Sequence, residues 1–201
     1  MRTLTFETKE AWAEARRGKI TGTRLKDIIV KRGTGKKIGF YELIAERLGI
    51  PSDGEDPMER GLRLEPEAIA RFEQETGKKV NKDLVIWTRD DDESIAISPD
   101  GFIGKKEALE VKCLSSARHI QAVIENKVPD DYEYQILQYF IVNDDLKTLY
   151  FLMYDPRIVA KDYICFQVHR KDVQGDVDTY LQFQKETMAE VIQWTEKLSN
   201  F

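Results

Sequence analysis

Two alternating kinds of apolar pattern constrain the fold of this chain more than any other feature. Apolar residues at helical spacing predict helices near 8–17, 22–31, 38–48, 58–76, 116–127, 131–144 and 172–198. Short runs rich in β-branched and aromatic residues predict strands near 84–88, 94–98, 102–104, 108–113, 147–154 and 162–168. We therefore expect an α/β fold with a central mixed β-sheet of about five strands, flanked by helices.

The length and the composition favour one ordinary domain. A chain of 201 residues that is 41% hydrophobic can bury a continuous core, so we expect a single domain over 1–201. Two cysteines, Cys113 and Cys165, form neither a CxxC pair nor a secreted-type framework, which predicts reduced thiols and a cytoplasmic protein. The sequence shows neither a signal peptide nor a run of ~18 apolar residues, so we expect no membrane partner.

The charged residues are unevenly distributed. A net charge of -5 argues against a nucleic-acid partner, because a phosphate-binding domain normally carries a basic surface. Between Arg16 and Lys37, however, the sequence is rich in lysine and arginine and contains a single acid, Asp27. This basic stretch is either a solvated helix face or a contact surface for nucleic-acid phosphates.

The segment 108–113 places an acid and a lysine on one predicted strand. Glu110 and Lys112 are two residues apart and point to the same face, while Leu109, Val111 and Cys113 fill the opposite face. Cys113 is then expected to be a packed core residue and not a nucleophile. The alternative is that Glu110 and Lys112 form an ordinary exposed strand pair.

Asp100 precedes Gly101 at a predicted turn, so a hairpin would bring its carboxylate beside that of Glu110. Two close carboxylates repel each other unless a cation lies between them, and oxygen ligands without nearby His or Cys suit Mg²⁺ or Mn²⁺. Such ions polarise a phosphoryl oxygen and activate water for phosphodiester hydrolysis. Lys112 would position or deprotonate that water, or neutralise the transition state. The alternative for Asp100 is an ordinary turn aspartate.

Several short motifs follow one another between about residue 10 and residue 157. They are Trp12 with the segment 16–23, Arg60-Gly61 followed by Glu65, Ser98-Pro99-Asp100-Gly101, Leu109-Glu110-Val111-Lys112-Cys113, Tyr132 with Gln135, and Tyr154-Asp155-Pro156-Arg157. In these motifs the chain resembles the PD-(D/E)xK nucleases, and more narrowly the lambda-exonuclease-like (YqaJ-type) phage recombination exonucleases. The resemblance implies their restriction-endonuclease-like core.

The resemblance also implies a catalytic site with two bound Mg²⁺ ions. Its residues are Asp100, Glu110 and the Val111 carbonyl as metal ligands, Glu65 as a ligand through water, Lys112 beside the nucleophile, and Gln135 in the lining. From the residues alone, Glu65 lies next to an expected apolar stripe of Leu62, Ile69 and Phe72, and a solvated helix carboxylate is the alternative. Gln135 could equally cap a backbone group.

A pocket for the 5′ phosphate is implied in the same way. The corresponding positions are Arg16, Thr23 and Ser98, with Arg118 nearby, and an arginine fork with hydroxyl donors suits a phosphate. The alternative for the hydroxyls is that Thr21 or Thr23 is a helix N-cap. Met58 occupies the position of a wedge that separates the end of the duplex, and its alternative role is a hydrophobic staple.

Taken together, the resemblance implies a Mg²⁺-dependent 5′-to-3′ exonuclease on linear double-stranded DNA, acting in the bacterial host cytoplasm. It implies a ring-shaped homotrimer and a single-strand annealing protein as partner. The alternatives are an endonuclease on the same core and a non-catalytic DNA-binding protein. His119 and His169 pair with no nucleophile, and we assign them structural or surface roles.

Overall fold

The computed structural model describes Thr8, Ala11, Glu14, residues 35–50, Gly54 and residues 56–199, with side chains up to residue 193. The chain passes repeatedly between two compact units. Unit 1 comprises Met1–Leu64, Cys113–Lys127 and Tyr154–Ile164, and unit 2 comprises Glu65–Lys112, Val128–Met153 and Cys165–Phe201. The single nuclease domain stays a prediction. Apart from Ala11 and Glu14, which are helical, the helices expected near 8–17 and 22–31 lie outside the described residues.

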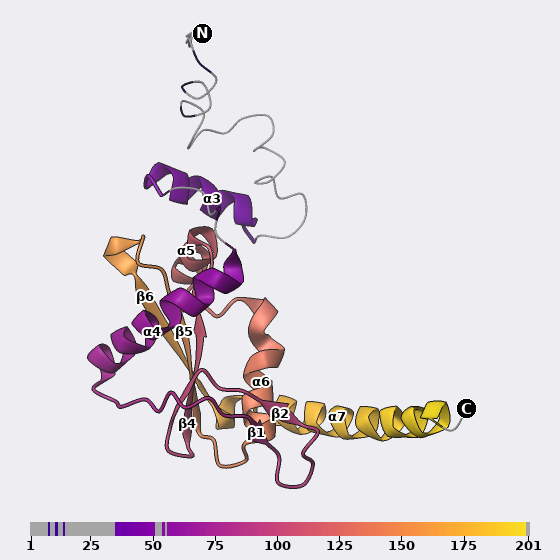
Figure 1. Ribbon diagram of the computed structural model, residues 1–201. Helices are drawn as coiled ribbons and strands as arrows, with labels where there is room; N and C mark the ends of the chain where they lie inside the picture. Colours follow the sequence, from indigo (N-terminus) through magenta and orange to yellow (C-terminus); the bar gives the residue numbers. More distant parts are fainter. Residues whose placement is uncertain are drawn as a thin grey trace. The chain divides into compact units, whose positions relative to one another are not determined.

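Two helices precede four consecutive strands, and helices and strands are mixed along the rest of the described chain (Figure 1). In chain order they are α3 (Ile38–Arg47), α4 (Pro57–Thr76), β1 (Trp87–Thr88), β2 (Ala96–Ile97), β3 (Gly101–Ile103), β4 (Glu107–Lys112), α5 (Ser116–Glu125), η1 (Asp130–Tyr132), α6 (Glu133–Val142), β5 (Thr148–Tyr154), η2 (Val159–Lys161), β6 (Tyr163–His169) and α7 (Arg170–Ser199).

Helices α3 and α5 form the apolar centre of unit 1. Its buried residues are Tyr41, Ala45, Ile50, Ala117 and Ile120. The Tyr41 hydroxyl donates a hydrogen bond of 2.6 Å to Glu125 Oε1, which ties the two helices together through polar atoms as well.

Beside this centre, unit 1 holds a buried charge network. The Arg60 guanidinium lies 2.9 Å from Asp155 Oδ1 and donates to the Cys113 carbonyl at 3.1 Å. The Ser116 hydroxyl also donates to Asp155, whose side chain is fully buried. Hydrogen bonds from Arg157 and Ser116 lower the pKa of Asp155 although burial alone would raise it, so the carboxylate stays charged.

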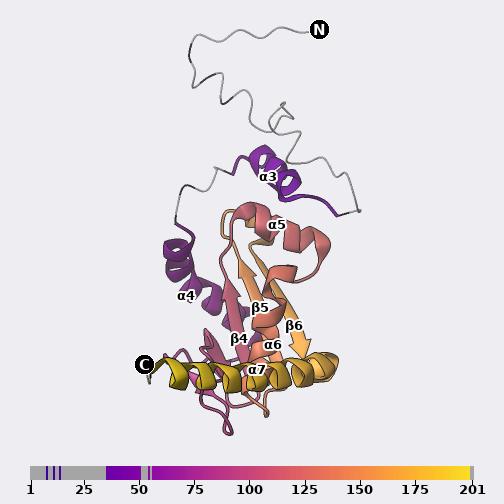
Figure 2. The same cartoon turned by 90° about the vertical axis from the view of Figure 1, so that its right-hand side faces the viewer.

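Unit 2 contains a four-stranded mixed sheet in the order β3-β4-β5-β6. Strand β4 is antiparallel to β3 and parallel to β5, with Glu110 level with Phe151 and Lys112 level with Met153. Figure 2 shows β4, β5 and β6 side by side, with α6 against the sheet. Consecutive β5 residues contact opposite helical layers: the ring of Tyr150 packs on Phe72 of α4, and that of Phe151 on Tyr132 at the start of α6.

Two arginines bind the carboxyl end of α6 within unit 2. Arg170 donates to the Phe140 carbonyl at 2.7 Å and to the Asn143 carbonyl at 2.6 Å. Arg89 donates to the Ile141 carbonyl and forms an ion pair with Asp144. These guanidinium groups satisfy carbonyls that a helix end leaves without partners and complement the negative end of the helix dipole.

The predicted mixed sheet flanked by helices is confirmed, with one difference in strand count. The strands expected near 84–88 and 94–98 pair with each other as β1 and β2, in a separate two-stranded sheet. A second difference concerns α4, where Leu62 is exposed and does not belong to the apolar stripe. The buried residues on that stretch are Leu64, Ala68, Ile69 and Phe72.

Candidate active site

Strand β4 carries the centre of the candidate site. Its residues 108–111 are all buried, because parallel pairing with β5 and the flanking helices cover both faces. Glu110 is only 2% exposed, whereas the Lys112 side chain at the end of the strand is 20% exposed. Cys113 is buried, as expected for a packed residue, and forms no disulfide with another described residue. Glu110 and Lys112 share one face of the strand, as predicted, since Lys112 Nζ contacts the Glu110 carboxylate. Glu110 is nevertheless buried and does not face solvent.

Asp100 lies beside Glu110, as the hairpin predicts. The register pairs Gly101 with Leu109, and Asp100 Oδ2 accepts a 2.7 Å hydrogen bond from the Val111 N–H. Glycine is needed after Asp100, since a Cβ atom at Gly101 would lie 2.5 Å from Val80 Cγ1. Two backbone hydrogen bonds between Asn81 and Phe102 hold the segment around Val80 this close to Gly101.

Three donors surround the Glu110 carboxylate. Gln135 Nε2 donates to Oε1 at 2.6 Å, the Tyr139 hydroxyl donates to Oε2 at 2.6 Å, and Lys112 Nζ lies 2.5 Å from Oε1. Burial and the charge of Glu110 raise the pKa of Tyr139, which keeps its hydroxyl protonated as a donor. Lys112 also lies over the ring of Tyr132, with 5.0 Å between Nζ and the ring centroid.

The carboxylates of the site repel one another. Burial and then the charge of Glu110 raise the pKa of Asp100 from its ordinary 3.8 to about 7, against the opposing effect of the Val111 N–H. Glu65, half-buried on α4, has its pKa raised by burial and by Glu110 and lowered by Lys112. Glu65 is thus electrostatically coupled to the same group.

This donor set fits a divalent cation. Carboxylate and carbonyl oxygens are ligands that Mg²⁺ and Mn²⁺ prefer, and a cation between Asp100 and Glu110 would relieve the repulsion that raises the Asp100 pKa. Within the described part of the chain, no three His, Cys, Asp or Glu side chains are arranged as a ready metal cluster. Of the predicted ligand side chains, Asp100 and Glu110 are close enough for the charge of one carboxylate to raise the pKa of the other.

Comparison with known proteins identifies the family. The model of the YqaJ-like viral recombinase domain matches residues 11–145, more than half of the chain. The chain belongs to the YqaJ-like viral recombinase family. The family confirms the resemblance drawn from the motifs and supports a nuclease role on DNA, with metal dependence as a general property of the family.

Two solved structures are similar to this YqaJ-family chain over nearly its whole length. One is the alkaline exonuclease LHK-Exo from Laribacter hongkongensis, with 28% identity, a TM-score of 0.62 and coverage of 96% of this chain and 99% of that chain. The other is LHK-Exo in complex with dAMP, with 28% identity, a TM-score of 0.61 and the same coverage. None of the curated proteins compared matches the chain.

The residues expected to bind the 5′ phosphate are only partly described. Arg16 and Thr23 lie outside the described residues, and Ser98 is exposed in unit 2. Arg118 belongs to unit 1, where its guanidinium donates to Gln121 at 3.2 Å. Met58, also in unit 1, is 74% exposed and follows Asp56, which caps α4. The pocket therefore stays a prediction.

Tyr139 is the site residue that sequence reasoning missed. It is fully buried, one helical turn after Gln135, and both side chains bind the Glu110 carboxylate. A spacing of four residues places two side chains on one helix face. That spacing was available in the sequence, but a tyrosine in an otherwise apolar helix indicates core packing first.

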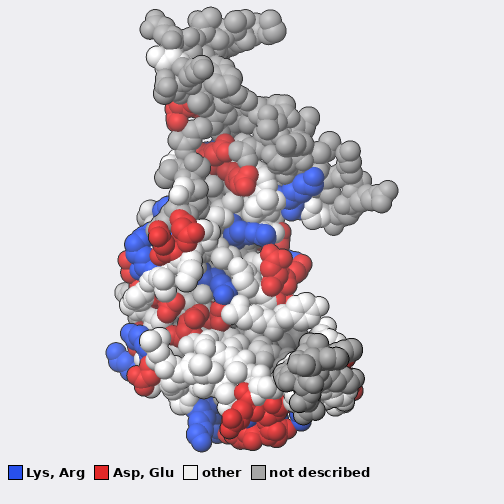
Figure 3. All heavy atoms as spheres, turned by 45° about the vertical axis from the view of Figure 1, so that its right-hand side comes forward, with Lys and Arg blue, Asp and Glu red and all other residues white. Residues whose placement is uncertain are grey.

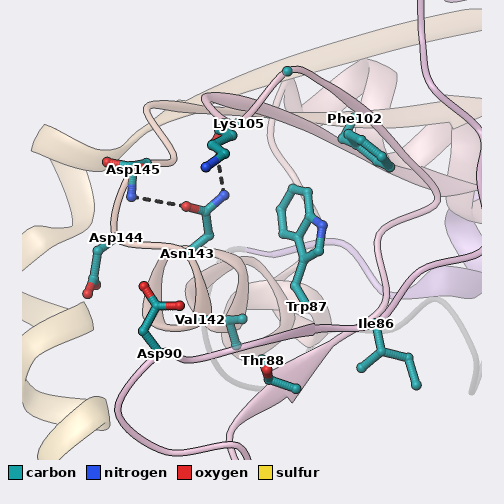
Figure 4. Close-up of a pocket in the computed structure, with 11 residues that line it drawn as sticks. Ile86, Trp87, Thr88, Asp90, Phe102, Lys105, Val142, Asn143, Asp144 and Asp145 are labelled. Atoms are coloured by element: carbon teal, nitrogen blue, oxygen red, sulfur yellow. Dashed lines mark hydrogen bonds between the residues drawn. The ribbon is translucent and has the colours of Figure 1, made fainter.

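A cavity of about 470 Å³ in unit 2 (Figure 4) is lined by other residues than the site, although the ring of its Trp87 lies edge-on to that of Tyr139. Trp87 and Phe102 line it, and Asp90, Asp144 and Asp145 contribute carboxylates. Lys105 is the one basic lining residue. A cavity with this charge disfavours phosphate, so it does not suit the DNA backbone.

Proposed function

We propose that this YqaJ-family nuclease is a Mg²⁺-dependent or Mn²⁺-dependent exonuclease that degrades one strand of linear double-stranded DNA from the 5′ end. It would release mononucleotides and leave a 3′ single strand for recombination by annealing. The observation that carries the proposal is the juxtaposition of Asp100 and Glu110, held by the Val111 N–H and by donors from α6.

The chemistry follows from the residues that surround the two carboxylates. Asp100, Glu110 and the Val111 carbonyl would hold the cation, and Glu65 would hold a water beside it. A bound divalent ion supplies positive charge at a phosphoryl oxygen and lowers the pKa of water. Lys112, kept by an ion pair and an aromatic ring, would stabilise negative charge that develops on the phosphoryl group.

The test compares linear with covalently closed circular duplex, each with Mg²⁺ and with EDTA. We expect hydrolysis of the linear form alone, and only with Mg²⁺. Glu110→Gln should abolish it, because the metal site loses a charged ligand. Glu107→Gln is the matched control, since Glu107 lies on the same strand but pairs with Lys78. Cutting of the circle would support an endonuclease, and inertness a non-catalytic DNA-binding protein.

The end preference is tested in the same assay with two linear substrates. If Arg16, Thr23, Ser98 and Arg118 bind the terminal phosphate, a 5′-phosphorylated duplex should be degraded faster than its 5′-hydroxyl counterpart, because charge-assisted hydrogen bonds place the first scissile bond. Met58 would separate the terminal base pair. Equal initial rates on the two ends would contradict the phosphate pocket and leave the metal site standing.

For assembly we propose a ring-shaped homotrimer in the host cytoplasm that hands the exposed strand to an annealing protein. An acidic chain holds DNA weakly on its own, and on the face drawn in Figure 3 acidic and basic side chains of the described residues are intermixed. A ring would retain the substrate by enclosing it. Sedimentation that finds a stable monomer at working concentration contradicts the trimer. Among the helices the structure describes, none has the length and hydropathy to span a membrane.

A further inference from the structure

We propose that a second phosphate-binding site lies in unit 2 between the start of β5 and the start of α7, away from Asp100 and Glu110. A cavity of about 540 Å³ is found there. It is lined by Lys147, Thr148, His169, Arg170, Lys171 and Gln174, and none of these residues is acidic. The inference rests on the proposed nucleic-acid substrate and adds a site that takes no part in the cleavage step.

Hydrogen bonds connect the segments of chain that line this cavity. The Arg170 N–H donates to the Lys147 carbonyl at 3.0 Å, and Arg170 Nε donates to the Leu146 carbonyl at 2.8 Å. Thr148 Oγ1 lies 3.2 Å from His169 Nδ1 across the start of β5 and the end of β6. The backbone positions on both sides of the cavity are therefore fixed relative to each other.

Two positive charges remain available for a ligand. Arg170 is occupied by the carbonyls at the end of α6, but Lys147 and Lys171 are exposed, and within the described part of the chain neither forms an ion pair with a carboxylate. Two ammonium groups with a neighbouring hydroxyl and imidazole supply positive charge and hydrogen-bond donors for the anionic oxygens of a backbone phosphate. The carboxylate-lined cavity near Trp87 lacks this combination.

The position of the site indicates what it would do. Thr148 is level with Glu107, and Phe151 is level with Glu110, so three residues of strand separate the cavity from the metal-binding carboxylate. At ~3.3 Å per residue this is roughly 10 Å. The same length corresponds to about three base-pair steps of duplex at ~3.4 Å each. A backbone phosphate held here would add affinity for DNA without contacting the scissile bond.

The experiment measures the salt dependence of DNA binding. Binding of a fluorescent duplex to the full chain is followed by anisotropy in EDTA, so that no DNA is cleaved, over a series of salt concentrations. For Lys147→Ala/Lys171→Ala we expect weaker binding and a slope of log K against log salt that is shallower by about 1, since one phosphate contact is lost. Lys105→Ala is the control, because that exposed lysine lies among carboxylates.

Titration with inorganic phosphate and with dAMP distinguishes the two sources of the ligand. Shifts of the Lys147 and Lys171 side-chain NMR signals with these probes, together with an unchanged duplex slope in the double variant, would assign the site to free phosphate esters. An unchanged slope without such shifts, or an equal change in Lys105→Ala, would overturn the site. Failure of the proposed function is separate: it would appear as absent hydrolysis by the unmutated protein with Mg²⁺, while the phosphate titration still reports on the cavity.

Discussion

Removing the metal should make the stability of this protein depend on the ionisation of Asp100. Burial and Glu110 raise the Asp100 pKa from 3.8 to about 7 in the folded state, while the unfolded chain keeps the ordinary value. Below pH 3.8 both states bind the proton. As the pH rises toward 7, the unfolded state releases it first, so the free energy of unfolding falls and the loss is complete above about pH 7.

The size of this effect follows from the shift. About three pKa units at ~1.36 kcal/mol each give a loss of up to about 4 kcal/mol. For a chain of this length that corresponds to roughly 8–16 °C in Tm. Asp100→Asn removes the charge but can still accept the Val111 hydrogen bond. In EDTA at pH 8 the variant should therefore be more stable than the unmutated protein, and near pH 4 the two should converge.

The assay is denaturant or thermal unfolding in EDTA from pH 4 to pH 8. Asp145→Asn serves as control, because Asp145 is exposed and lies away from the carboxylates of the site. Mg²⁺ should restore stability to the unmutated protein at pH 8 more than at pH 5, since protons and the cation compete for the same oxygens. A flat stability profile in EDTA, or the same fall in Asp100→Asn, would refute the reasoning.

Two further substitutions test the groups that hold the carboxylates. Tyr139→Phe keeps the ring but leaves Glu110 without one donor, so the Mg²⁺ concentration for half-maximal hydrolysis should rise about 10–100-fold, with exposed Tyr134→Phe as control. In unit 1, Arg60→Leu removes the ion pair between Arg60 and Asp155 but leaves the Asp155 carboxylate buried. This loss should lower the free energy of unfolding by about 3–5 kcal/mol. Unfolding curves that match the unmutated protein would contradict this second expectation.

The centre of the site could be predicted from the sequence because strand parity and hairpin geometry are local properties. Glu110 and Lys112 share a face on any strand, and the turn at Asp100-Gly101 brings the aspartate to their level. The burial of Glu110 could not be predicted in this way. It results from β5, which pairs in parallel from more than thirty residues further along the chain.

Pairing partners also explain the differences in the rest of the fold. The runs near 84–88 and 94–98 have strand composition, but composition does not say that they pair with each other instead of joining β3. The exposure of Leu62 depends on which face of α4 is buried, and Leu64, Ala68 and Phe72 occupy that face. Strand pairing and the buried face of α4 depend on tertiary contacts, so they cannot be predicted from the local pattern of a single sequence.

The donors to Glu110 depend on contacts at the far end of the helix that carries them. Gln135 and Tyr139 lie on α6, and Arg170 binds the last carbonyls of that helix. We expect Arg170 to support the proposed metal site through this helix, while Lys147 and Lys171 line a separate cavity. Loss of Arg170 should therefore weaken metal binding as loss of Tyr139 does, whereas loss of the two lysines should change the affinity for DNA and leave the metal requirement as it was.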